Sequence, residues 1–160
     1  MDVGTFAELK ETLNIAYQLC DNIEQSGCWP MSGQLKMSDL LKYELVAFCR
    51  QLAAADKDFS LDERGFITSL FGLQGALLAD KVPENSGNVP LIITLSQQVA
   101  QFEAQNGVSH TNGVGVSTVL LMVFEMTGKA FIISGGNDSR EIAVYNNYVK
   151  LMQDFVKSIS

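Results

Sequence analysis

The densest group of side chains that could do chemistry is an acidic turn, residues 56–63, which lies between two apolar helical patterns. Carboxylate and hydroxyl oxygens are the ligands that a hard cation such as calcium prefers. Because the turn offers only part of a calcium coordination shell, we expect weak, millimolar binding. The candidate metal ligands are Asp56, Asp58, Ser60 and Glu63. No other cofactor is predicted.

The same turn also has a structural explanation that needs no ligand. Ser60 followed by Glu63 is a capping-box pattern, in which the hydroxyl and the carboxylate bond the free amides at the start of a helix. Asp62 would favour the positive end of the helix dipole by about 0.3–1 kcal/mol. Capping leaves Asp56 and Asp58 without a structural role, so the alternative prediction is a capped turn that binds no metal.

An EF-hand is the rival interpretation of the turn, because its aspartates and Ser60 fall at the first, third, fifth and seventh positions of such a loop. That loop also needs glycine at its sixth position and a bidentate glutamate at its twelfth. Leu61 and Ile67 occupy those two positions. A standard EF-hand is therefore not expected.

His110 is the only histidine, and it lies in a polar, glycine-rich loop at 106–115. Histidine can act as a general base, but the sequence places no serine or cysteine nucleophile beside it. We therefore expect a solvated side chain and a protein that is not an enzyme. A small hydrolase or transferase that uses His110 is the remaining alternative.

The composition predicts one soluble domain over residues 1–160, with 47% hydrophobic residues to form a core. The net charge of -7 disfavours nucleic-acid and membrane-surface binding, which need clustered basic residues. Cys20, Cys28 and Cys49 have no zinc-ligand spacing, so free thiols and a cytoplasmic location are expected. We expect Cys49 in the core and Cys28 exposed.

Apolar residues recur at spacings of three and four along most of the chain, which predicts an all-α bundle of six or seven helices. We expect helix caps at Thr5 and Ser38, and a helix break at Gly72. The predicted helices cover about 6–25, 38–55, 60–72, 74–81, 90–105, 117–133 and 139–158.

The segment 114–133 is apolar enough to raise the question of a membrane span. It contains Glu125 and Lys129, and charges near the centre of a spanning helix cost roughly 2.5–3.5 kcal/mol each. We therefore expect the buried central helix of a soluble bundle.

A faint internal repeat appears when the chain is shifted by 78 residues. The shift superposes Ser60 on Asp138 and Glu63 on Glu141, and it also aligns apolar helical positions on either side. It predicts two helix-turn-helix halves, each with a polar turn that a carboxylate caps.

The acidic turn resembles that of TerB-like domains, the tellurite-resistance family, which have an alanine-rich helix end followed by Asp-Gly-x-Ile/Val-Ser-x-x-Glu. Here Asp56, Phe59, Ser60 and Glu63 are in register, whereas Lys57 replaces the usual glycine. The resemblance implies an all-helical fold, an association with bacterial stress response or phage defence, divalent-cation binding and no established catalytic chemistry.

These observations together predict a non-catalytic bacterial stress-response or interaction module with a weak cation site. We expect a protein partner, which could be a second copy of the chain. The alternative is an adaptor bundle that binds its partner through an apolar helix face and holds no metal.

Overall fold

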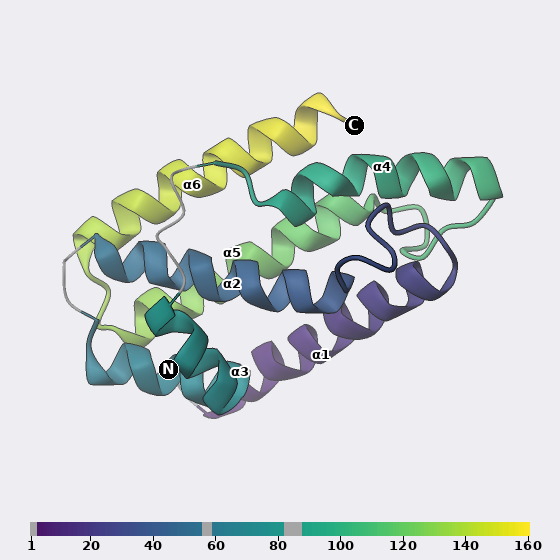
Figure 1. The fold of residues 1–160 in the computed structure, drawn as a ribbon. Helices are drawn as coiled ribbons and strands as arrows, with labels where there is room; N and C mark the ends of the chain where they lie inside the picture. Colours follow the sequence, from purple (N-terminus) through teal and green to yellow (C-terminus); the bar gives the residue numbers. More distant parts are fainter. Residues whose placement is uncertain (1–2, 56–58, 82–87) are drawn as a thin grey trace.

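Two apolar helices form the centre of the computed structural model: α2 (Met37–Ala54) and α5 (Val116–Ser134). They pack against each other, and both contact all four outer helices. The outer helices are α1 (Val3–Gln25), α3 (Leu61–Lys81), α4 (Leu91–Asn106) and α6 (Ser139–Ser158). Figure 1 shows α1 and α3 on one side of the central pair and α4 and α6 on the other. The structure describes residues 3–55, 59–81 and 88–160.

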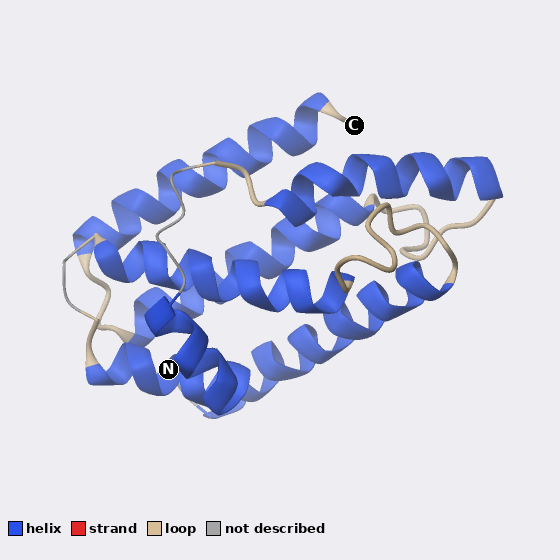
Figure 2. Cartoon of the chain, in the orientation of Figure 1, coloured by secondary structure: helices blue, strands red, loops and turns tan. Residues whose placement is uncertain are grey.

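The predicted all-α bundle is confirmed, since every regular element among the described residues is a helix (Figure 2). The two helices expected on either side of Gly72 are joined into the single element α3, which is kinked there. Gly72 has φ 78° and ψ -179°, a conformation that glycine adopts at little cost and that interrupts regular helical geometry. The predicted break is therefore a kink, and the described part of the chain forms six helices.

Two of the predicted caps are wrong because the helices begin earlier than expected. Thr5 lies inside α1, which already includes Val3, and Ser38 lies inside α2. The residue that precedes α2, Lys36, makes no side-chain cap bond. The N-terminus of α2 is instead capped from another helix.

Carboxylates from neighbouring helices supply the missing caps. Glu24 of α1 accepts a hydrogen bond from the Met37 amide through Oε1 at 3.0 Å. Glu44 of α2 accepts bonds from the amides of Leu91 and Ile92 at the start of α4, both at 2.7 Å. Burial raises the pKa of Glu44, and the two amides oppose that rise. These bonds fix where α2 and α4 begin relative to their neighbours.

The loop after α1 folds over the core. Cys28 is fully buried, so the prediction of an exposed thiol is wrong. Trp29 is 2% exposed, and its indole Nε1 donates to the Leu35 carbonyl at 2.7 Å. Cys20 and Cys49 are also buried, and all three thiols are free, as expected.

By length and composition alone, α5 could cross a membrane, but 56% of its most apolar window is buried inside the bundle. Its contacts with the five other helices are those of a core helix, which is compatible with the expected soluble bundle. An exposed stripe remains on its outer side, at Met122, Met126 and Ile133.

The close packing of α5 against α2 and α6 depends on Gly128. A Cβ atom there would lie 2.8 Å from both Phe48 Cε2 and Tyr145 Cε2. The rings of Phe48 and Tyr145 stack in this place, with centroids 6.2 Å apart. Glycine at this position thus allows an aromatic cluster to reach the backbone of α5.

We expect Gly128→Ala to lower the free energy of unfolding by about 1–3 kcal/mol, because a methyl group overpacks this cluster. Gly65→Ala is the matched control, since Gly65 is an exposed helical glycine whose Cβ would meet nothing within 4 Å. This control should stabilise the protein by about 0.5–1 kcal/mol. Urea unfolding of both variants tests the pair, and equal effects would contradict the packing described.

Candidate functional site

The structure confirms the capping box of the acidic turn. The Ser60 amide donates to Glu63 Oε1 at 3.0 Å, and the Glu63 amide donates to Ser60 Oγ at 3.1 Å. Asp56 and Asp58, the other candidate metal ligands, lie outside the described residues. Of the predicted cation ligands, the structure therefore brings together Ser60 and Glu63, and it shows them as a helix cap.

The second carboxylate oxygen of Glu63 is not used by the cap. Glu63 is only 1% exposed, and its Oε2 has no hydrogen-bond partner among the described residues. This oxygen faces the turn between α5 and α6, because a Cβ atom on Gly135 would lie 2.8 Å from it. Glycine at position 135 thus leaves room for a buried carboxylate oxygen.

The start of α6 repeats the arrangement at the start of α3. Asp138 Oδ1 accepts hydrogen bonds from the amides of Arg140 at 2.8 Å and Glu141 at 3.2 Å. Glu141 is fully buried, as Glu63 nearly is. The predicted correspondence therefore holds for Ser60 and Asp138 as the residues that accept first-turn amides, and for Glu63 and Glu141 as buried carboxylates.

Both buried glutamates act electrostatically on one thiol of α2. Burial raises the pKa of Cys49, and the charges of Glu63 and Glu141 raise it further. The first turns of α3 and α6 thus direct carboxylates toward the same part of the core. No group of three or more His, Cys, Asp or Glu side chains is arranged to hold a metal within the ranges that the structure describes.

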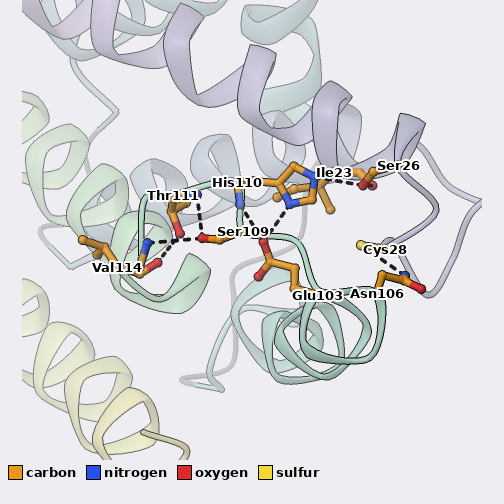
Figure 3. Close-up of polar contacts among 10 residues, drawn as sticks. Ile23, Ser26, Cys28, Glu103, Asn106, Ser109, His110, Thr111 and Val114 are labelled. Atoms are coloured by element: carbon orange, nitrogen blue, oxygen red, sulfur yellow. Dashed lines mark hydrogen bonds and ion pairs between the residues drawn. The ribbon is translucent and has the colours of Figure 1, made fainter.

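A second constellation surrounds His110, which is not the solvated loop residue that the sequence suggested. Its side chain is 13% exposed, and its Nδ1 lies 2.7 Å from Oε2 of Glu103, which is 11% exposed. The same oxygen accepts the His110 backbone amide at 2.9 Å (Figure 3). Glu103, at the end of α4, thus fixes both the loop and the imidazole ring.

The other ring nitrogen of His110 contacts a serine from the opposite end of the sequence. Nε2 lies 2.9 Å from Oγ of Ser26, just after α1, and this oxygen also donates to the Ile23 carbonyl at 2.9 Å. A carboxylate, an imidazole and a hydroxyl therefore form a continuous chain (Figure 3). Sequence reasoning missed Ser26 and Glu103, although a lone histidine near a helix end was a usable signal.

The loop that carries His110 is held by its own polar side chains. Ser109 Oγ accepts hydrogen bonds from the amides of Thr111 at 3.5 Å and Gly113 at 3.2 Å. The Thr111 hydroxyl donates to the Val114 carbonyl. These bonds limit the ways in which the imidazole can move away from Ser26.

Comparison with known proteins supplies no relative: no protein-family model, curated protein or solved structure matches the chain.

The buried thiols predict a loss of stability at alkaline pH. Burial, the largest cause, raises the pKa of Cys20 to about 12, and the pKa of Cys49 is raised as well. An unfolded thiol ionises near pH ~8.5, so above that pH the unfolded chain releases protons that the folded protein keeps. Each thiol should then lower the free energy of unfolding by up to about 1.4 kcal/mol per pH unit.

Urea unfolding between about pH 8 and about pH 10 measures this slope. Cys49→Ala should make the decline shallower than in the wild type, whatever its effect on stability at neutral pH. An identical slope in the variant would contradict the assignment of Cys49 as a thiol kept protonated by the core.

Proposed function

We propose that the protein is a bacterial stress-response or interaction module of the TerB-like kind, in which the acidic turn before α3 binds a divalent cation such as calcium. The support is the Ser60–Glu63 capping box, which occupies the place of the serine and glutamate in the turn that the sequence resembles. This function is binding and involves no chemistry at the turn.

The observation that carries the cation proposal is the environment of Glu63 Oε2. An ionised carboxylate that is buried needs a hydrogen-bond donor or a counter-charge. Oε1 has the Ser60 amide, whereas Oε2 has no hydrogen-bond donor among the described residues. A cation at the turn would supply the counter-charge, and Asp56 and Asp58 are the further acidic residues that the sequence offers.

The position of Glu63 also explains what a bound cation could regulate. Glu63 belongs to the first turn of α3, but its Oε2 lies against Gly135, between α5 and α6. A cation on this oxygen would stabilise the start of α3 against the turn between α5 and α6. These two helix ends would then be more rigid in the protein with cation bound than in the protein without it.

Calorimetric titration with calcium, magnesium and zinc tests the proposal, with Asp56→Asn combined with Glu63→Gln as the variant. Glutamine serves in a capping box as glutamate does, so this variant keeps the helix cap while it removes the charges. We expect binding heat at millimolar cation for the wild type and its loss in the variant. Asp154→Asn, at an exposed position of α6, is the matched control and should bind as the wild type does.

No binding heat for any of the three cations at millimolar concentration would refute the cation site. The second candidate function, an adaptor without metal, would then be favoured. The observation for it is the exposed stripe of α5, where Met122 is 54%, Met126 is 38% and Ile133 is 45% exposed. Single exposed apolar residues are common on soluble proteins, so this stripe is weaker support for a function than the buried carboxylate oxygen of Glu63.

A further inference from the structure

We propose that Ser26, His110 and Glu103 form a small acyl-transfer site that attacks esters of uncharged carboxylic acids, with Ser26 as the nucleophile. This activity goes beyond the proposed binding function and is independent of the acidic turn. It departs from the expectation, drawn from the sequence, that the protein is not an enzyme. His110 lies within hydrogen-bond distance of both Glu103 and Ser26, and Ser26 is exposed.

The hydrogen bonds of Glu103 select the form of His110 that a general base requires. A carboxylate beside Nδ1 favours the tautomer that carries its proton there, which leaves the lone pair on Nε2. That nitrogen lies 2.9 Å from Ser26 Oγ, within the range for proton transfer from a nucleophile to its base. Glu103 also accepts the His110 amide, so it is a positioning residue for the ring.

Ser26 is an exposed residue, so an acyl group can approach its hydroxyl from solvent. Its Oγ is 2.9 Å from both the Ile23 carbonyl and His110 Nε2. A hydroxyl has one proton to donate, and rotation about its C–O bond moves that proton from the carbonyl to the imidazole. The nucleophile can therefore reach the reactive arrangement without a change in the backbone.

The donors available to the developing oxyanion restrict the substrates. The amides of Gly27 and Cys28 both donate at 3.1 Å to carbonyls of the last turn of α1. The side-chain amide of Asn106 reaches the same loop, where its Nδ2 lies 3.9 Å from Cys28 Sγ, a weak acceptor that it can leave (Figure 3). Because the Gly27 and Cys28 amides are already bonded to these carbonyls, they are not free to stabilise the oxyanion. Loss of one oxyanion donor lowers the rate by about 10²–10³, so we expect reaction only with esters that have good leaving groups.

The net charge of -7 further favours uncharged acyl groups over acidic ones. Ser26 Oγ attacks the ester carbonyl carbon while its proton passes to His110 Nε2. The bond to the leaving alcohol breaks, and the alcohol takes that proton as it departs. Water then attacks the acyl-serine and gives a proton to Nε2, which returns it to Oγ as the carboxylic acid is released.

The probe for this site is p-nitrophenyl acetate. We expect a burst of p-nitrophenol and an acetyl group on the peptide that contains Ser26, both measured after an acid quench. A general base contributes about 10²–10⁴ in rate, so His110→Gln should slow acetylation of Ser26 by about 100-fold or more.

Three further variants keep the test decisive if His110→Gln unfolds the loop. Glu103→Gln, which keeps an oxygen that can accept the His110 amide, should slow acetylation in the folded protein, and Glu103→Asp, which keeps the carboxylate, should regain part of the rate. Ser158→Ala is the matched control, because Ser158 is an exposed helix-end serine whose hydroxyl donates to the carbonyl three residues earlier, as that of Ser26 does. It should leave the burst unchanged.

Acetylation of Ser26 that is lost with His110 and regained with Glu103→Asp supports the proposal. The absence of an acetyl group on Ser26 in the folded wild-type protein would overturn it. Acetylation of Ser26 at the same rate in folded Glu103→Gln and His110→Gln would also overturn it, since the hydroxyl would then react without its neighbours.

Discussion

The need to satisfy backbone amides at the helix N-termini governs how this bundle is assembled. The first amides of a helix have no partner within it, and a buried amide without a partner costs about 1–3 kcal/mol. Acidic side chains meet this need in α2, α3, α4 and α6, twice from a different helix. These residues are Glu24, Glu63, Glu44 and Asp138. Part of the acidic composition therefore acts inside the fold, where it orders the helices around α2 and α5.

The features that sequence reasoning predicted are those encoded locally. Apolar spacing identified the helices, Ser60 and Glu63 identified a cap, and Gly72 marked the kink of α3. The caps of α2 and α4 were missed because their acceptors come from other helices. Ser38 was predicted as the cap of α2 from the local preference of serine for that position, but the contact with Glu24 places the start of the helix one residue earlier. Ser26 and His110 are separated by 84 positions, so no local pattern could join them.

The two functional proposals use carboxylates that differ in their surroundings. Glu63 has one oxygen in a cap, and its other oxygen is buried with no hydrogen-bond partner among the residues that the structure describes, which suits it to hold a cation. Glu103 directs one oxygen to both the backbone amide and the ring of His110, which suits it to orient a base. Both residues lie at helix ends, where a side chain can reach from one element to the next.

Glu44 offers the most direct measurement of whether carboxylates from neighbouring helices hold the helix N-termini in place. Native-state amide exchange by NMR should show the Leu91 and Ile92 amides exchanging roughly tenfold faster in Glu44→Ala, since a lost cap costs about 0.5–2 kcal/mol. The first turn of α6, capped by Asp138, should keep its protection. Unchanged exchange at Leu91 and Ile92 in the folded variant would contradict this view of how the bundle is held together.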